Sequence, residues 1–363
     1  MRPAHALIDL DALRHNYRLA KSLSGRRALA VLKANAYGHG AVECARALAD
    51  DADAFAVACI EEALELRAAG IQQPILLLEG WFEANELPLL VEHQLWSVVH
   101  HQGQVQELLG AQLGTPLHIW LKLDSGMHRV GFDPAEYAEV WRQLERSQKV
   151  ASLTSMTHFS RADEPSSGRT EAQLETFERA TQGLNGPASL CNSSAVLAWP
   201  QAHGDWLRPG VMLYGATPFA FPQANADRLK PVMQLQSRII AVRELAAGEP
   251  IGYGSRFITQ RPTRVGVVAM GYADGYPRHA ADGTPVLVDG QRTQLIGRVS
   301  MDMLTLDLTD LPHSGLGSAV RLWGEGLNAS EVAHHAGTIA YQLFCNLNRV
   351  PRRFISSSSS FST

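Results

Sequence analysis

Along the first two thirds of the chain, short apolar runs alternate with segments of helical spacing. The strand-like runs span residues 28–34, 54–60, 74–80, 95–100, 117–124, 152–159, 188–193 and 206–215. Segments such as 134–147 lie between most of them and carry apolar residues at intervals of three and four. Eight strands that are apolar on both faces and alternate with helices predict a (β/α)8 barrel, an α/β fold.

The pattern changes after about residue 230. From there the chain has strand-like runs split by Gly and Pro, and one substantial helix is predicted over residues 328–348. We therefore expect three parts: a barrel over residues 1–230, a mostly β domain over 231–355, and a disordered serine-rich tail over 356–363.

Composition and charge exclude several classes of function. The 363 residues carry a formal net charge of -4, which gives no basic footprint for nucleic acid. No apolar run approaches the roughly 20 residues of a membrane span. The first dozen residues include two aspartates and no apolar region typical of a signal peptide. The four cysteines are widely spaced in apolar segments, which favours core residues over disulfides or a metal site. We expect a cytoplasmic protein.

Polar residues lie where the predicted strands end, which is where barrels place their active sites. Lys33 closes the first strand, either as an ordinary lysine with a solvated amine or as a reactive Schiff-base amine. The others near strand ends are Lys122, Asp124, Arg129, His158, Asn192, Ser193, Arg208 and Gly210. We expect these residues to converge on one rim of the barrel.

Ser193 and Gly210 belong to strands seven and eight, the usual phosphate-binding corner of this fold. A lysine and a phosphate corner in one barrel mouth suit pyridoxal 5′-phosphate, which needs an amine for its aldehyde and an anchor for its phosphate. Aldolase-type barrels combine the same two features, so the residues alone leave both classes open.

Eight stretches of the chain resemble, in order, those of the bacterial alanine racemases, which are fold-type III pyridoxal-phosphate enzymes. The stretches are VLKANAYGHG, LKLDSGMHRVG, THFSRADE, CNSSA, RPGVMLYG, IGYGSRF, GYADGYPR and GRVSMDM. The resemblance runs from about Ile8 to Phe354. It implies interconversion of L-alanine and D-alanine, for peptidoglycan synthesis or for catabolism of D-alanine.

The resemblance also implies two catalytic bases. Lys33 would hold the cofactor and act on one face of the substrate. Tyr253 would act on the opposite face and would come from the other subunit of a head-to-tail homodimer. Racemisation removes a proton from one face and returns one to the other, which suits two groups. Without the resemblance, Tyr253 would be predicted to be a turn residue between glycines.

Other residues receive roles from the same resemblance. Arg208 would face the pyridine nitrogen, with His158 orienting it; Arg129 would contact cofactor and substrate, positioned by Lys122, which is often carbamylated in the family. Further implied cofactor contacts are Tyr37, Asn192, Ser193, Gly210, Val211 and Tyr341. Met301 would bind the substrate carboxylate, and the implied entryway residues are Tyr272, Asp163, Arg278, Arg298 and Asp302.

Three other classes of protein are weighed against this interpretation. Related decarboxylases carry a catalytic cysteine in an acidic loop, whereas Cys345 lies in an apolar helical segment. Broader-specificity racemases usually bear a secretion signal, and non-catalytic cofactor-binding proteins consist of the barrel alone. The start of this chain and its predicted second domain therefore favour an alanine racemase.

Overall fold

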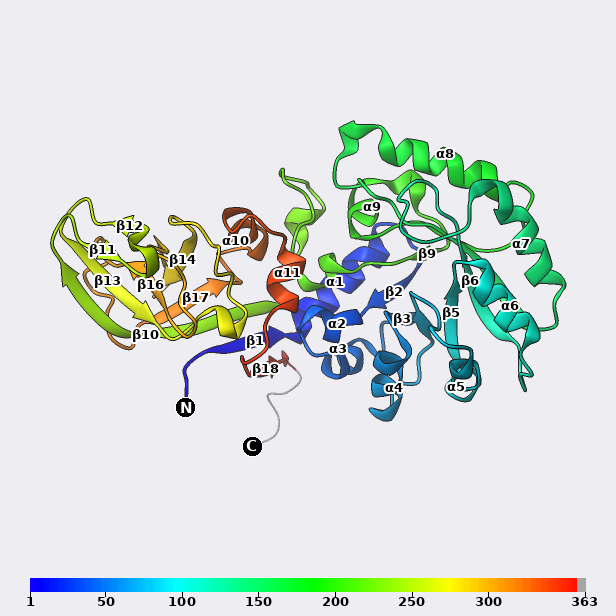
Figure 1. The fold of residues 1–363 in the computed structure, drawn as a ribbon, viewed down its shortest axis with the longest axis horizontal. Helices are drawn as coiled ribbons and strands as arrows, with labels where there is room; N and C mark the ends of the chain where they lie inside the picture. Colours follow the sequence, from blue (N-terminus) through cyan, green and yellow to red (C-terminus); the bar gives the residue numbers. More distant parts are fainter. Residues whose placement is uncertain (358–363) are drawn as a thin grey trace.

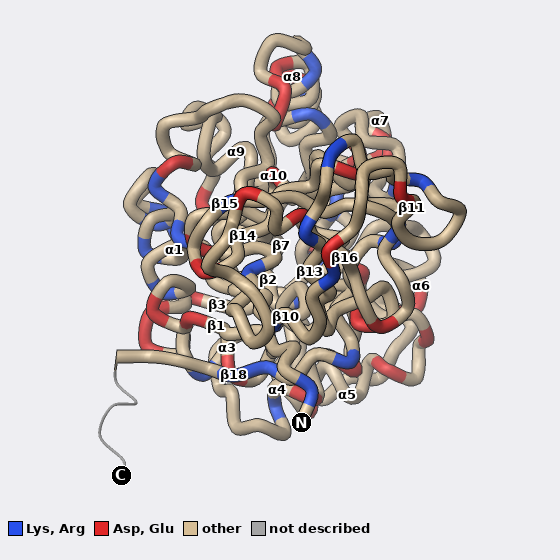
Figure 2. The backbone as a smooth tube through the Cα atoms, turned by 90° about the vertical axis from the view of Figure 1, so that its left-hand side faces the viewer, with Lys and Arg blue, Asp and Glu red and all other residues tan. Residues whose placement is uncertain are grey.

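The structure, a computed structural model, describes residues 1–357. Figure 1 shows two domains side by side, a barrel with helices and an elongated β domain. Figure 2 looks onto the β domain, where basic and acidic residues are interspersed rather than gathered by sign. No helix within residues 1–357 has both the length and the apolar character needed to cross a membrane.

The barrel is built from eight parallel strands. They are β2 (Arg27–Val31), β3 (Ala54–Val57), β4 (Ile75–Leu77), β5 (Leu95–Val99), β6 (Leu117–Lys122), β7 (Val150–Met156), β8 (Ala188–Ser189) and β9 (Trp206–Leu207). The ladder runs β8-β7-β6-β5-β4-β3-β2-β9. Between β8 and β9, backbone hydrogen bonds join Asp205 to Ala188 at 2.8 Å and Arg208 to Cys191 at 3.0 Å. The predicted (β/α)8 barrel is thus confirmed as a nearly closed barrel.

Helices cover the outside of this sheet (Figure 1). They are α1 (Leu10–Ser22), α2 (Lys33–Tyr37), α3 (Ala41–Leu48), α4 (Ile60–Ala68), α5 (Leu87–Glu92), α6 (Gln102–Gly110), α7 (Pro134–Arg146), α8 (Arg169–Thr181) and α9 (Ser193–Ala198). Helix α7 shows why they pack there: Tyr137, Val140, Trp141 and Leu144 form one buried stripe. Burial of such stripes drives the helices onto the sheet.

The second domain is mostly β, as predicted. Its strands are β10 (Met233–Leu245), β13 (Thr263–Val268), β14 (Pro285–Val288), β15 (Gln291–Gln294), β16 (Leu304–Asp307), β17 (Ala319–Trp323) and β18 (Arg352–Ile355), with a separate hairpin of β11 (Pro250–Ile251) and β12 (Phe257–Ile258). A strand that the sequence analysis missed, β1 (His5–Asp9), pairs antiparallel with β10 and parallel with β18. The N-terminus therefore contributes to the sheet of the second domain.

Several predicted element boundaries are wrong. Strand β2 ends at Val31, so Lys33 begins the next turn instead of closing the strand, and Arg208 directly follows β9 instead of lying within it. The late helix over 328–348 is two helices, α10 (Ala329–His335) and α11 (Ala340–Cys345). Gly337 lies between them with φ 64°, a left-handed conformation that ends a helix readily.

The predicted tail begins within the described residues and continues beyond them. Ser356 donates to a carboxylate oxygen of Asp11 at 3.1 Å, and the backbone N–H of Ser357 donates to the other at 2.6 Å. Residues 358–363 lie outside the described part of the chain. All four cysteines are unpaired, but only Cys44 and Cys191 are buried core residues; Cys345 is exposed, contrary to the prediction.

Candidate active site

A cavity of about 600 Å³ opens at the carboxyl ends of the barrel strands. This volume is within the usual range for a small-molecule site. Eleven of the predicted site residues line it: Lys33, Tyr37, Lys122, Arg129, His158, Asn192, Ser193, Arg208, Gly210, Val211 and Tyr341. Residues at the ends of five barrel strands or in the loops that follow them, together with one residue of α11, thus form a single site.

Four cationic side chains share this cavity. Lys33, Lys122, Arg129 and Arg208 all line it, whereas Glu79 is the one acidic residue among the described lining. Several positive charges in a low-dielectric cavity make its electrostatic potential positive, and this potential attracts anions. The site is therefore suited to a ligand with several negative groups.

Arg208 is buried and held by hydrogen bonds to the barrel. Its Nη1 donates to the Ser189 hydroxyl at 2.6 Å, and its Nη2 donates to the carbonyls of Thr157 at 2.6 Å and Leu190 at 3.2 Å. Burial lowers the pKa of Arg208 to about 10, so the side chain remains protonated at neutral pH. Within residues 1–357 its Nε has no hydrogen-bond acceptor, so this N–H remains for a ligand.

His158 lies against Arg208, with its Nδ1 3.4 Å from Arg208 Nη2. Burial, followed by the nearby positive charges of Arg208 and Lys122, lowers the pKa of His158 well below its ordinary value. The imidazole is therefore neutral near pH 7 and can accept from the guanidinium. This contact agrees with an orienting role for His158.

The corner between β8 and β9 collects hydrogen-bond donors. The backbone N–H groups of Gly210 and Met212 point at the Ser193 hydroxyl, at 2.9 and 3.3 Å. A Cβ placed on Gly210 would lie 2.7 Å from the Tyr37 hydroxyl, so the absence of a side chain keeps this corner open. The Ser193 and Tyr37 hydroxyls beside these backbone N–H groups make the corner suitable for a phosphate.

Lys33 starts an unusual turn, α2, that the sequence analysis did not foresee. Residues 34 to 37 all have positive φ, from 51° to 53°, although none is glycine. Each such residue costs about 1–2 kcal/mol in an L-amino-acid chain. The turn places Lys33 and Tyr37 on the same cavity.

The side chains of Glu62 and His39 hold this strained conformation. Glu62 accepts from the N–H of Ala34 at 2.6 Å and from that of Ala58 at 2.7 Å. The buried His39 donates from Nδ1 to the carbonyls of Ala36 and Tyr37, at 3.1 and 2.9 Å. The surrounding structure therefore fixes the position of the lysine.

Lys122 is a buried amine among cations. Burial, with smaller effects from Arg208 and Arg129, lowers the pKa of Lys122 to about 7. Among the described residues no carboxylate forms an ion pair with it. About half of the amine is therefore neutral near pH 7, whereas an ordinary lysine is almost fully charged there.

The remaining predicted residues do not line the cavity of their own chain. Met301, Asp302, Arg298, Arg278 and Tyr272 belong to the β domain, and Asp163 lies in the loop after β7. Tyr253 is 70% exposed, between β11 and β12. Figure 1 places this hairpin at the end of the β domain that is farthest from the barrel.

Several residues of the site were missed. Ser189 and His39 contact the predicted residues Arg208 and Tyr37, and Glu62 holds the turn that begins at Lys33. Phe82, His100 and Cys345 line the cavity. A position near the end of a predicted barrel strand was the available sequence signal for Ser189 and His100. Glu62 acts across 28 residues of sequence, which no local pattern reveals.

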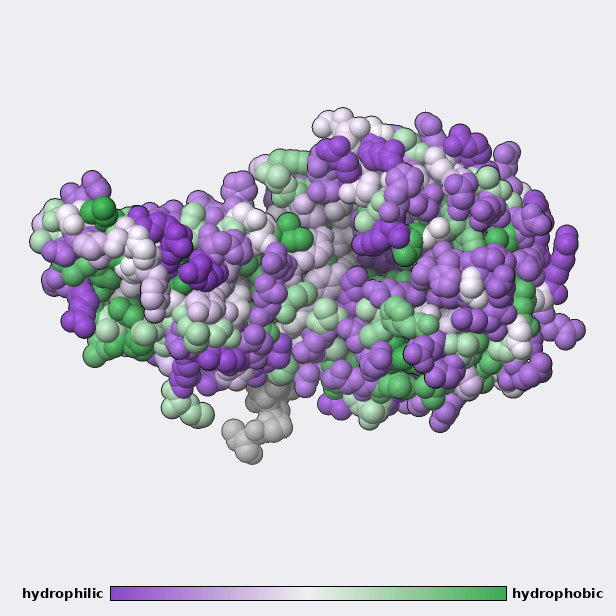
Figure 3. All heavy atoms as spheres, in the orientation of Figure 1, coloured by the Kyte–Doolittle hydropathy of each residue, from purple (hydrophilic) through white to green (hydrophobic). Residues whose placement is uncertain are grey.

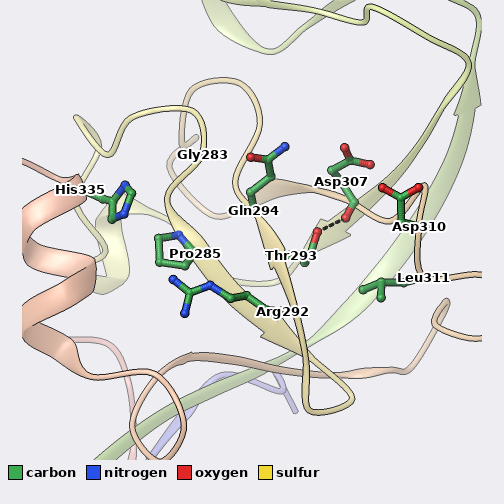
Figure 4. A pocket seen from close by; sticks show the side chains of 9 residues that line it. All are labelled: Gly283, Pro285, Arg292, Thr293, Gln294, Asp307, Asp310, Leu311 and His335. Carbon is green, nitrogen blue, oxygen red and sulfur yellow. Dashed lines mark hydrogen bonds between the residues drawn. The ribbon is translucent and has the colours of Figure 1, made fainter.

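A second hollow lies in the β domain (Figure 4). It measures about 310 Å³, and its lining includes Arg292, Asp307, Asp310 and His335. Arg292 is already paired with Glu331, and Thr293 bonds the carbonyl of Asp307. This hollow contains no lysine and none of the predicted site residues. The barrel cavity is the better candidate.

The fold and cavity define a class: two-domain barrel proteins with a lysine and an anion-binding corner in one site. Comparisons with known proteins give the family. The family profile "Alanine racemase, N-terminal domain" matches residues 8–218, and "Alanine racemase, C-terminal domain" matches residues 232–354. The chain belongs to the bacterial alanine racemases, and its activity is alanine racemisation.

Similar individual proteins agree with this family. The alanine racemase of Pseudomonas taetrolens is 66% identical over 355 residues, covering 98% of this chain and 99% of the relative. The catabolic alanine racemase of Pseudomonas putida is 65% identical at the same coverage. The crystal structure of the biosynthetic alanine racemase from Pseudomonas aeruginosa has a TM-score of 0.95 at 52% identity, covering 98% and 100% of the two chains.

Proposed function

We propose that the chain racemises alanine with pyridoxal 5′-phosphate and two bases contributed by two subunits. The chemistry of the cavity supports this cofactor. It combines a lysine, a corner of hydroxyl and backbone amide groups, a buried arginine whose Nε–H is free, and an excess of positive charge. Bound there, the cofactor would withdraw electrons from the substrate and acidify its Cα–H bond.

Lys33 would hold the cofactor through its amine and then exchange the Cα proton on one face. Tyr37, Tyr341 and Ser193 line the cavity with Gly210 and would anchor the phosphate. Burial raises the pKa of Tyr341 to about 12, which keeps its hydroxyl a hydrogen-bond donor at neutral pH. Asn192 and Val211 complete this side of the site.

Arg208 would donate to the pyridine nitrogen but would not protonate it, because a guanidinium holds its proton at ordinary pH. Arg129 lines the same cavity and would bind the substrate carboxylate. Arg208 would therefore contact the cofactor, and Arg129 would contact the substrate. His158 would keep Arg208 in place through their contact.

The observation that carries the two-subunit proposal is the position of Tyr253. It is 70% exposed, it does not line the Lys33 cavity, and its hairpin lies far from the barrel. Hydrophobic residues are visible over this end of the β domain in Figure 3. Ile240, Ile258 and Leu316 are exposed apolar side chains of the same domain. In a head-to-tail homodimer this end would cover the barrel mouth of the other subunit.

The same arrangement accounts for the other β-domain residues. Met301 is 52% exposed, and its backbone would bind the substrate carboxylate in the other subunit's cavity. Tyr272, Arg278, Arg298 and Asp302 would line the entryway there. Asp163 is a charged neighbour of Tyr341 and would lie on the same corridor from the barrel side.

We propose that Lys122 is carbamylated. Carbon dioxide reacts with neutral amines, and the lowered pKa makes Lys122 partly neutral at pH 7. We expect a carbamate NMR signal with carbon-13-labelled bicarbonate that grows as pH rises through about 7 and is absent in Lys122→Arg. A signal that persists in the variant, or none in the wild type, would reject this assignment.

Mixed dimers test the shared site. Lys33→Ala and Tyr253→Phe subunits should each be nearly inactive alone, because every site lacks one base. In a one-to-one mixture after subunit exchange, half of the dimers are mixed and each has one complete site. We expect about one quarter of wild-type racemisation, measured by circular dichroism of L-alanine.

The control is a mixture of differently tagged Lys33→Ala subunits, which should remain inactive. If the two variants form mixed dimers and those dimers are inactive, Tyr253 and Lys33 do not act in one site across the subunits. Serine and lysine as comparison substrates test the alternative of a broader-specificity racemase. Release of carbon dioxide from an amino acid would instead indicate a decarboxylase.

We further propose that the enzyme works in the cytoplasm, where alanine is available. Racemisation serves either direction: it supplies D-alanine for peptidoglycan or converts D-alanine for catabolism. The similar proteins include one described as catabolic and one described as biosynthetic.

A further inference from the structure

The turn that carries Tyr253 is backbone-strained and lightly attached. It joins β11 (Pro250–Ile251) to β12 (Phe257–Ile258), and Gly252, Gly254 and Ser255 have φ of 73°, 70° and 48°. The positive φ of Ser255 is costly because this residue has a side chain. A two-stranded hairpin of this size is marginally stable by itself. Something outside the hairpin must therefore fix its conformation.

The apolar support beneath the hairpin is small. Ile251, Val265 and Ile296 form a cluster separate from the main core, with Leu245 and Phe257 packed against it. This cluster holds the two strands but does not reach the tip. Tyr253 itself is 70% exposed and has no side-chain hydrogen bond within the described residues. Its direction is consequently set by the backbone of the turn.

Arg256, the residue after the turn, makes the polar attachment. Its Nε and Nη2 donate to the two carboxylate oxygens of Asp282 at 3.1 and 3.0 Å. Nη2 also donates to the carbonyls of Ala280 at 3.0 Å and Gly297 at 2.9 Å. Asp282 in turn accepts from the N–H of Gly297 at 2.7 Å. One guanidinium thus joins the hairpin to two other segments.

The other end of the turn is fixed by close packing. A Cβ placed on Gly252 would lie 3.3 Å from the backbone nitrogen of Arg298. The bidentate pair of Arg256 with Asp282 holds the turn after Tyr253, and the packing of Gly252 against Arg298 holds it before Tyr253. A bidentate arginine–carboxylate pair defines direction as well as distance, which a lysine or an apolar residue does not.

We propose that Arg256, held by Asp282, is a positioning residue that aims Tyr253 into the active site of the other subunit. This inference rests on the proposed role of Tyr253. Arg256 does not line the cavity, and its described hydrogen bonds go to Asp282, Ala280 and Gly297. Its effect on Tyr253 therefore passes through the backbone of residues 252–255. A displacement of about 1 Å in a catalytic group can cost on the order of 100-fold in rate.

Mixed dimers of Lys33→Ala and Tyr253→Phe subunits separate positioning from general stability. Their one complete site takes Tyr253 from the Lys33→Ala subunit. We expect Arg256→Gln in that subunit to lower racemisation by about 10- to 100-fold. In the Tyr253→Phe subunit the same substitution can displace only a phenylalanine, which belongs to the inactive site. There it should leave activity within about twofold. Asp282→Asn should show the same dependence on the subunit that carries it.

The matched control is Arg261→Gln, which removes an exposed ion pair with Asp310 elsewhere in the β domain. It should have little effect in either subunit. Thermal unfolding of each variant, together with the visible absorption of its bound cofactor, reports folding independently of activity. If Arg256→Gln does not fold, Asp282→Asn decides the question.

Equal losses in both subunits would show that Arg256 stabilises the domain in general, and no loss in either would show that the turn does not need it. Either result overturns the inference while leaving the shared site intact. If the parent mixed dimer is inactive, the proposed function fails first, and the inference fails with it.

Discussion

Replacing Lys33 with alanine will give a folded protein that no longer turns yellow with pyridoxal 5′-phosphate and no longer racemises alanine. Lys33 lies at the start of the left-handed turn of residues 34–37 and lines the cavity. It would both attach the cofactor and act as a catalytic base. Losing both roles should lower the rate by at least about 10⁴-fold. Visible absorption measures the first effect, and circular dichroism of L-alanine measures the second.

Lys230→Ala is the matched control, because Lys230 is exposed and lies outside the cavity. It should retain both colour and activity. A Lys33→Ala protein that binds the cofactor with unchanged absorption would show that another amine carries it. A wild-type protein that stays colourless with added cofactor would remove the basis for the cofactor proposal.

Tyr253→Phe will affect the two enantiomers unequally when hydrogen exchange is followed in deuterated water. Without the phenol, one face of the substrate loses its base, and exchange from that enantiomer should fall by about 10²–10⁴-fold. Exchange from the other enantiomer requires only Lys33 and should persist. Mass spectrometry of alanine recovered from each starting enantiomer measures the difference.

Racemisation itself should fall with the slower exchange, because conversion needs both faces. Equal and small losses for the two enantiomers would mean that Tyr253 is not a base. The cofactor should still give its visible absorption in this variant, since Lys33, the residue that would hold it, is unchanged. This separates the outcome from that of Lys33→Ala.

The barrel could be predicted because its physical cause is local. Strands buried on both faces leave continuous apolar runs, and the carboxyl ends of parallel strands meet at one rim. Residues as distant in sequence as Lys33 and Arg208 were therefore expected together, and the cavity brings them together. The family resemblance added roles that the residue types alone did not indicate, such as that of Tyr253 as a base.

Other features depend on contacts that no local pattern contains. The left-handed turn at residues 34–37 has an ordinary sequence and is held by Glu62, far along the chain. The strand β1 lies beside β10, more than 200 residues away, so its partner is invisible from its own sequence. Tyr253 is the extreme case, because its proposed target lies in another subunit.

The most direct test is a crystal structure of the enzyme with pyridoxal 5′-phosphate bound. We expect a head-to-tail dimer in which the hydroxyl of Tyr253 from one subunit and the amine of Lys33 from the other flank the cofactor on opposite faces. A dimer that leaves every Tyr253 hydroxyl in solvent, remote from every Lys33, would contradict it.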